Sequence, residues 1–235
     1  MTRVLRSDKS SWACGSNGQG QLADGTLVSR TTFVRENQNF TDIEAIGAFG
    51  TYAANCSYIV RSNISGGKLY WCGYNNDYVL GNFIGNQTAI SSFTTNATQD
   101  AYPYQGNLLD ASNTPKFKIV FSGSQQSGYN YMCLLDKNGN AWVAGWNGVG
   151  NLSVNSTSTV TTYTKPLLPL KKVVDIANTG QIGGPDAGIQ YILEDGTIWG
   201  AGNNTYGSNC YDAYPINQTY SVAQALFGFS SKDLT

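Results

Sequence analysis

A six-residue pattern recurs four times along this chain and constrains its fold more than any other feature. Each copy consists of an aromatic residue, two mostly small residues, glycine, any residue and asparagine. Recurrence at long intervals is typical of repeat architectures, in which each repeat is one supersecondary unit that buries its apolar face against its neighbours. We therefore predict structural roles for the aromatic, glycine and asparagine residues of the copies, chiefly Trp12, Gly15, Asn17, Gly73, Asn75, Trp142, Gly145, Asn147, Trp199, Gly202 and Asn204.

The segments around the copies predict antiparallel strands. An Asn-Gly pair at 138–139 precedes the third copy, and an Asp-Gly pair at 195–196 precedes the fourth. Such pairs supply the positive φ angles that two-residue hairpin turns require. A short apolar segment follows each copy and fits a buried strand, namely 43–47, 119–123, 173–177 and 222–228. The sequence thus predicts an all-β protein.

The interval between copies is long and uneven. Successive motif glycines lie 58, 72 and 57 residues apart, and the extra length falls at about 81–115, a tract rich in Asn, Thr, Ser, Gln and Tyr. Long insertions on a repeat scaffold usually lie on one face, often the binding face. The alternative is a surface loop that is tolerated because lengthening a loop costs little entropy. We expect a single domain over 1–235 that carries this polar insertion.

The first copy also points to a family. The stretch from Trp12 to Thr26, WACGSNGQGQLADGT, closely resembles the regulator of chromosome condensation repeat, whose signature is W-x-W-G-x-N-x-x-G-Q-L-G-x-G. The resemblance implies a β-propeller with blades of four antiparallel strands. Family members typically have seven repeats, whereas four are visible here. The chain therefore forms about four blades closed by pairing of its N- and C-terminal strands, or it is part of a larger propeller.

Departures from the family pattern limit what the resemblance implies about activity. The second Trp of the signature is replaced by Cys14, Cys72, Ala144 and Ala201, and the recurrent His of the family is absent. The founding member is known for exchange activity on the GTPase Ran, which depends on surface residues that have no identified counterpart here. The resemblance therefore implies the fold and leaves that activity as a distant alternative.

Charge is sparse and balanced. The chain has 14 Lys and Arg against 15 Asp and Glu, so no field of one sign attracts nucleic acid or an anionic membrane. No apolar run approaches the roughly 20 residues that span a bilayer, and the N-terminus lacks the apolar core of a signal peptide. We expect no nucleic-acid partner and no membrane insertion.

Most of the residue types that catalysis uses are missing or unpaired. The chain has no His, which excludes Ser-His-Asp and Cys-His systems and imidazole metal ligands. Its five cysteines are an odd number without a C-x-x-C pair, which argues against a disulfide framework and a zinc site. A carboxylate pair of the glycosidase kind cannot be assigned from the sequence. We predict no catalytic residues, no metal, no cofactor and no enzymatic activity.

Four aromatic residues are candidate binding residues. Tyr74 and Trp146 follow the motif glycine in a turn, where side chains tend to be exposed, and Tyr102 and Tyr104 flank a proline in the insertion. Aromatic rings beside Asn and Gln suit carbohydrate or protein recognition. The alternative for Tyr74 and Trp146 is that both rings pack against a neighbouring blade.

Together these features favour a non-catalytic structural or binding module in a large assembly. The uncharged surface rich in Asn, Thr and Tyr predicts a virion component such as a phage tail fibre, spike or decoration protein. Its location would be a virion or another extracellular-facing assembly, otherwise the cytoplasm, and its partners would be other subunits and a glycan or host receptor. One alternative is a regulatory propeller that binds a small GTPase or another enzyme. A further alternative is a lectin-like carbohydrate-binding module.

Overall fold

The computed structural model describes residues 1–50, 55–80, 88–95, 104, 106–122, 129–179, 187–204 and 219–230. Strands dominate these ranges and form four antiparallel sheets. The helical structure among them consists of two short 3₁₀ helices, η1 (Asn63–Ser65) and η2 (Asn76–Tyr78). Neither has the length and apolar character that crossing a membrane requires, and this holds for every helix in the described ranges. The predicted all-β propeller fold with four antiparallel blades is confirmed.

The chain divides into two compact units, and each unit holds two of the sheets. Unit 1 comprises Met1–Asn76 and Asn82–Phe117, and unit 2 comprises Asp77–Gly81 and Lys118–Thr235. A single domain over 1–235 stays a prediction.

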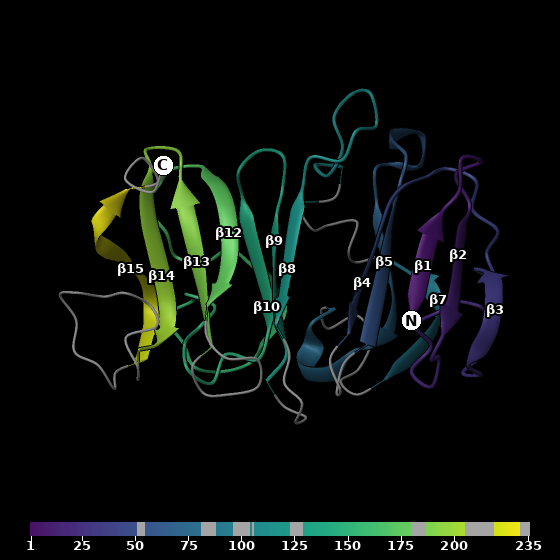
Figure 1. Ribbon diagram of the computed structural model, residues 1–235. Coiled ribbons are helices and arrows are strands. Elements are labelled where there is room, and N and C mark those ends of the chain that lie inside the picture. The colour runs from purple at the N-terminus through teal and green to yellow at the C-terminus, as the bar shows by residue number, and fades with distance from the viewer. Residues whose placement is uncertain are drawn as a thin grey trace. The chain divides into compact units, whose positions relative to one another are not determined.

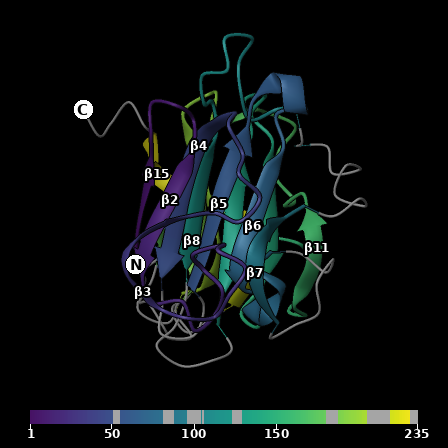
Figure 2. The same ribbon diagram turned by 90° about the vertical axis from the view of Figure 1, so that its right-hand side faces the viewer.

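The sheets of unit 1 contain three and four strands in chain order (Figures 1 and 2). The first sheet consists of β1 (Thr2–Leu5), β2 (Ser11–Gly15) and β3 (Arg30–Arg35). The second consists of β4 (Ile43–Gly50), β5 (Asn55–Arg61), β6 (Leu69–Tyr74) and β7 (Ala89–Thr94). Each copy of the pattern here forms a central strand and the turn after it, β2 in the first sheet and β6 in the second.

The sheets of unit 2 repeat the four-stranded arrangement. The first consists of β8 (Lys118–Ser122), β9 (Tyr131–Leu135), β10 (Ala141–Gly145) and β11 (Val160–Thr164). The second consists of β12 (Val173–Thr179), β13 (Gly188–Leu193), β14 (Thr197–Asn203) and β15 (Thr219–Ser230). The third copy of the pattern forms β10, and the fourth forms β14.

Each of the four sheets has two ends, which differ in the turns that they carry. We call the end that carries the tight turns between β1 and β2, β5 and β6, β9 and β10, and β13 and β14 the hairpin end. The opposite end carries the turn after the motif glycine, and we call it the motif end. The linkers from β3 to β4 and from β11 to β12 also lie at the hairpin end, because the strands alternate in direction.

The prediction that 222–228 is the same kind of strand as 43–47 is wrong. In β15 the pairing is antiparallel to β14, with Gln224 opposite Gly200 and Ala225 opposite Trp199. These residues therefore belong to the fourth strand of their sheet, whereas 43–47 lies in the first strand of its sheet. Apolar composition is common to both strand types, so only the pairing partner separates them.

Both terminal strands have partners within their own sheets. The strand β1 pairs with β2, and β15 pairs with β14. Pairing of the two terminal strands with each other stays a prediction.

The tract 81–115 contains more than a surface loop. The strand β7 lies within it and pairs with β6, with Ile90 opposite Gly73. Leu108 and Leu109 are fully buried. The described part of this tract therefore completes the second sheet and contributes to the core of unit 1.

Each unit has its own apolar core between its sheets. In unit 1, Ile43, Ile59 and Phe93 are buried in one cluster. In unit 2, a larger cluster contains side chains from both sheets, including Tyr131, Cys133, Val143, Ile189 and Tyr191. Burial of such side chains contributes roughly 1.5–3 kcal/mol each to folding.

Candidate functional site

The motif glycines have backbone conformations that other residues rarely adopt. Gly15, Gly73, Gly145 and Gly202 have φ angles of 107°, 107°, 112° and 116°. A Cβ at Gly145 would lie 2.5 Å from the carbonyl oxygen of Asn130, and a Cβ at Gly73 would lie 2.1 Å from that of Asn55. Only glycine combines this φ with such close approach of the adjacent strand.

The four motif asparagines are buried, and two of them, Asn17 and Asn147, hold the turn that follows them. The side-chain oxygen of Asn17 accepts the backbone N–H of Leu22 at 2.8 Å, and its amide donates to the carbonyl of Thr26 at 2.9 Å. Asn147 makes the same pair of bonds, to Leu152 N–H at 2.9 Å and to the Ser156 carbonyl at 2.7 Å. An amide that accepts and donates at once closes such a turn, so these asparagines act in folding.

These turns also join neighbouring sheets within a unit. Gly25 N–H donates to the Ser91 carbonyl on β7 at 2.8 Å, and Asn155 N–H donates to the Ser221 carbonyl on β15 at 2.8 Å. A Cβ at Gly150 would lie 2.5 Å from Ser221 Cα. The motif-end turns of the first and third sheets are therefore occupied by contacts that hold sheet to sheet.

At the hairpin end, a turn carboxylate is linked to the motif Trp. Asp8 accepts the Ser10 hydroxyl at 2.6 Å, and Ser10 Oγ in turn accepts Trp12 Nε1–H at 2.9 Å. Asp136 accepts Trp142 Nε1–H directly at 3.2 Å. The last sheet repeats the hydroxyl relay with Asp195, Thr197 and Trp199. These carboxylates order turns, which agrees with the turn predicted from the Asp-Gly pair at 195–196.

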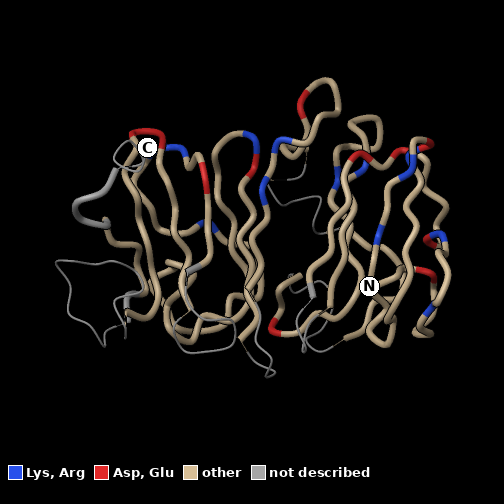
Figure 3. Tube along the Cα trace, in the orientation of Figure 1, with Lys and Arg blue, Asp and Glu red and all other residues tan. Residues whose placement is uncertain are grey.

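Most charged residues of the described ranges lie at the hairpin ends of their units (Figure 3). Several are paired there, with Lys9 to Glu44 at 2.6 Å, Arg61 to Asp42 at 2.7 Å and Lys118 to Asp175 at 2.6 Å. Lys171 pairs with Asp195, and this bond lowers the pKa of Asp195. The few charges along the strands and at the motif ends include Arg30, which is paired with Asp24 at 2.7 Å. The hairpin ends are thus the charged surfaces of both units.

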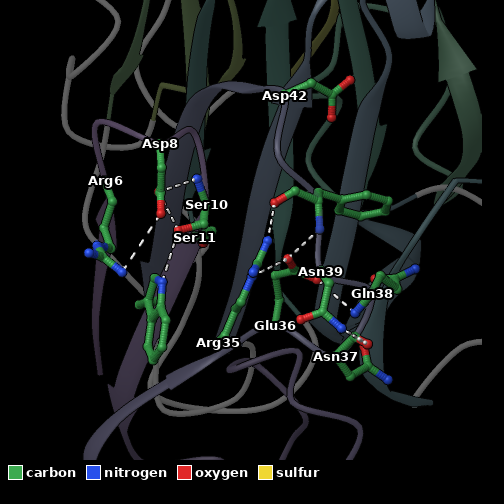
Figure 4. Close-up of polar contacts among 12 residues, drawn as sticks. Arg6, Asp8, Ser10, Ser11, Arg35, Glu36, Asn37, Gln38, Asn39 and Asp42 are labelled. Carbon is green, nitrogen blue, oxygen red and sulfur yellow. Dashed lines mark hydrogen bonds and ion pairs between the residues drawn. The ribbon is translucent and has the colours of Figure 1, made fainter.

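The linker between β3 and β4 is organised by one buried carboxylate (Figure 4). Glu36 is 1% exposed and accepts backbone N–H groups of Gln38 and Phe40, each at 2.7 Å. Burial raises the pKa of Glu36, although these bonds oppose the shift. Arg35 donates to the Phe40 carbonyl at 2.8 Å. These contacts lie within the linker and the last residue of β3, so Glu36 has a structural explanation.

The corresponding linker in unit 2 borders a groove. The groove has a volume of about 590 Å³ and lies between the β9–β10 turn, the β11–β12 linker and the β13–β14 turn. Its walls combine basic with apolar side chains, namely Lys165, Pro166, Leu168, Pro169, Leu170, Lys171 and Lys172, and Glu194 also lines it. The sequence analysis overlooked it. The sequence signal for this groove is the segment KPLLPLKK at 165–172, which combines leucines, lysines and two prolines between two strands.

Comparison with known proteins gives matches in structure alone. No protein-family profile matches the sequence, and no curated protein matches it. Prp20p from Saccharomyces cerevisiae, whose structure was described with its binding properties to Gsp1p and histones, superposes with a TM-score of 0.60 at 13% identity. That match covers 96% of this chain and 48% of Prp20p. The fold is that of the RCC1-type β-propeller.

Two other solved structures show the same RCC1-type fold. Yeast RCC1 (Prp20) bound to Kap60 matches with a TM-score of 0.58 at 14% identity, over 93% of this chain and 45% of that one. Human WBSCR16 matches with a TM-score of 0.56 at 15% identity, over 92% of this chain and 48% of that one. The chain thus spans about half the length of these proteins.

On this RCC1-type scaffold, the candidate aromatic residues have different surroundings. Tyr74 is half-buried at the end of β6, and Trp146 is half-buried against the core of unit 2, edge-on to Tyr129 at a centroid distance of 4.8 Å. Tyr104 is fully buried, so its ring is not offered to a partner. Tyr102 lies outside the described residues. A binding role for Tyr74 and Trp146 stays a prediction.

The motif Trp residues, for which structural roles were predicted, differ in burial. Trp142 is buried, whereas Trp12 and Trp199 are half-buried and present part of their rings to solvent. The three copies that begin with Trp thus share a hydrogen-bonded indole and differ in how far it is buried.

The cysteines offer no reactive site among the described residues. Cys56, Cys72 and Cys133 are buried free thiols, and Cys14 is free and half-buried. Burial raises the pKa of all three buried thiols, that of Cys72 to about 11, which keeps them protonated at neutral pH. No group of three or more metal-ligating side chains occurs within the described ranges.

Proposed function

We propose that this chain is a protein-binding β-propeller module that acts through the hairpin ends of its units, in the manner of a regulatory propeller. The main support for this proposal is that charged residues are concentrated at the hairpin ends, whereas motif-end turns make contacts between sheets. Charged surfaces of this kind steer association and set specificity more than they add affinity. The structural neighbours support the same role, since they include one described with binding to Gsp1p and histones and one bound to Kap60.

The partner on this proposal is a protein such as a small GTPase or another regulatory enzyme. The comparisons give no support to the virion component, host receptor or glycan that composition predicted, and no observation on the site favours a lectin. Those hypotheses can be tested directly. A virion component would be present in purified particles, and a lectin would bind immobilised glycans.

The test is a complex rebuilt from purified components. A partner isolated with the tagged chain is expressed separately and mixed with it, and native mass spectrometry is expected to show a defined stoichiometry. Hydrogen exchange should then slow at the hairpin-end segments 6–10, 62–68, 137–140 and 194–197. Protection confined to the motif-end segments 16–29 and 147–159 would contradict the proposal, as would failure of every candidate partner to form a complex.

A further inference from the structure

The groove of unit 2 has positive charge that the surrounding residues leave unneutralised. Of its three lysines, Lys171 is paired with Asp195, while Lys165 donates to the neutral side-chain oxygen of Asn140 at 2.8 Å. Neither Lys165 nor Lys172 has an ion-pair partner among the described residues. Glu194 also lines the groove, and its carboxylate accepts the backbone N–H of Lys172 at 3.1 Å. Two ammonium groups therefore carry charge that no carboxylate of the described residues neutralises, and that of Lys165 lies over the Trp142 ring, 5.1 Å from its centroid.

The same wall presents apolar side chains to solvent. Leu170 is fully exposed, at 106% of its reference area, and Leu167, which does not itself line the groove, is 51% exposed. Leu168 packs instead against the core of unit 2 and anchors the segment between them. Exposed leucines beside a groove are a feature of interaction sites, because covering them on association removes apolar surface from water.

The wall is held in place before any ligand arrives. Pro166 and Pro169 fix two φ angles of the linker. The backbone N–H of Leu167 donates to the Ser153 carbonyl at 2.7 Å, and that of Val173 donates to the Gly139 carbonyl at 2.9 Å. A preordered wall lowers the entropy lost on binding.

We propose that this groove binds an extended acidic peptide segment carrying apolar side chains, supplied by the protein partner of the propeller. This inference rests on the proposed function and names the chemistry of the partner at one site. Carboxylates of the segment pair with Lys165 and Lys172, and an apolar side chain covers Leu170. Charge complementarity selects this occupant. Glu194 and Asp195 at the rim disfavour a uniformly anionic surface, whereas a peptide can place its carboxylates away from them.

The test uses the full chain and a fluorescein-labelled eight-residue peptide of alternating acidic and leucine residues. Fluorescence anisotropy is expected to give a Kd on the order of 10–100 µM that weakens as NaCl rises. The isomer in which lysine replaces every acidic residue should not bind. Vesicles containing phosphatidylserine should not bind either.

Variants assign the binding to the groove. The double change Lys165→Gln and Lys172→Gln should weaken binding about tenfold, and Leu170→Ser about threefold. The matched control, Lys68→Gln with Lys116→Gln in unit 1, removes the same charge and should leave the Kd unchanged. Thermal unfolding verifies folding of each variant. If the double variant unfolds early, Lys172→Gln alone carries the comparison, because its ammonium has no ion-pair partner among the described residues.

The inference is overturned by a lack of binding of the acidic peptide, by equal binding of the basic isomer or by an equal loss in the control variant. Vesicle binding without peptide binding also overturns it and assigns the groove to an anionic lipid surface. If a rebuilt partner complex protects hairpin ends while the peptide fails to bind, the proposed function stands and only this inference falls.

Discussion

The linkers that join the two sheets within each unit occupy the same place in the repeat but are built in opposite ways. In unit 1, residues 36–42 fold around the buried carboxylate of Glu36, and Phe40 packs against the core beneath the guanidinium of Arg61, 4.2 Å from the ring centroid. In unit 2, residues 165–172 contain no acidic residue and leave Leu170 fully exposed. One linker is closed on itself, and the other is open to a ligand.

The scaffold holds the ends of both linkers alike. Ile43 N–H donates to the Lys9 carbonyl at 3.3 Å, and Val173 N–H donates to the Gly139 carbonyl at 2.9 Å, so each linker ends at the preceding hairpin turn. The difference between them therefore comes from their own side chains. This is how a repeat fold acquires a site, since the scaffold is shared and the surface segments are free to differ.

The largest expected effect is on the closed linker. Glu36→Ala removes the acceptor of two backbone N–H groups and should lower the free energy of unfolding of unit 1 by about 3 kcal/mol. Urea unfolding measures the loss, and hydrogen exchange should locate it at 36–42. Lys165→Ala in the open linker is the control and should change stability by less than about 0.5 kcal/mol. Equal losses in the two variants would remove the distinction between closed and open linkers.

The motif asparagines allow the two units to be compared at the motif end. Asn17→Ala and Asn147→Ala should each cost about 2 kcal/mol, because the N–H of Leu22 or of Leu152 loses its acceptor. The loss should be larger at position 17, because the Asn17 amide also donates to Asp24 at 3.0 Å. Urea unfolding followed by hydrogen exchange measures each loss in its own unit. A loss below about 0.5 kcal/mol at both positions would show that the turns close without their asparagines.

A pH series tests the charge at the hairpin end of unit 1. Burial alone would raise the pKa of Asp42, but bonds from Arg61 and Ser65 outweigh it and lower the pKa below the usual 3.8. Its stabilisation is therefore complete above about pH 5 and is lost as the pH falls through 3.8 toward the folded value. Asp42→Asn should cost about 1 kcal/mol at pH 7 and nothing near pH 2.

The titration of Glu36 changes the free energy of unfolding in the opposite direction with pH. The cost of Asp42→Asn is therefore measured as the difference between the variant and the parent chain at each pH. Because its folded pKa is raised, its titration favours folding below its ordinary pKa, and this contribution is lost as the pH rises through the folded value. A cost of Asp42→Asn that stays constant from pH 7 to pH 2 would exclude the ionised carboxylate as its source.

The smallest expected effect concerns the exposed leucine. Leu170→Ser should change the free energy of unfolding by less than about 0.5 kcal/mol, because the side chain has little contact to lose. Urea unfolding of the purified variant measures it. A loss of more than about 1 kcal/mol would mean that Leu170 is covered in solution and that the open linker is closed after all.

The spacing of the pattern predicted the strands and turns well, because local chemistry determines them. Gly145 and Gly202 are needed wherever a strand ends at positive φ, and Asn17 and Asn147 are needed wherever the next turn is closed by an amide. Such requirements involve neighbours in the sequence, so they recur with the repeat. The segment 222–228 was misassigned because strand order depends on pairing across the sheet.

The candidate site was harder to predict because exposure depends on distant contacts. Tyr104 resembled an exposed loop aromatic and is fully buried. The sequence did not single out Lys165 and Lys172, because positive and negative residues are balanced in the chain as a whole. Their arrangement around a groove follows from the packing of two sheets that are separate in sequence.

The sequence by itself determined that this chain is an all-β repeat protein, where its hairpins turn, and which glycines and asparagines hold its turns. It did so because these features depend on backbone geometry within a few residues. Only the tertiary structure decided which strand closes each sheet, which linker folds on its own carboxylate and which stays open beside a groove. Those outcomes depend on the contacts between sheets, where side chains far apart in the chain share or exclude water.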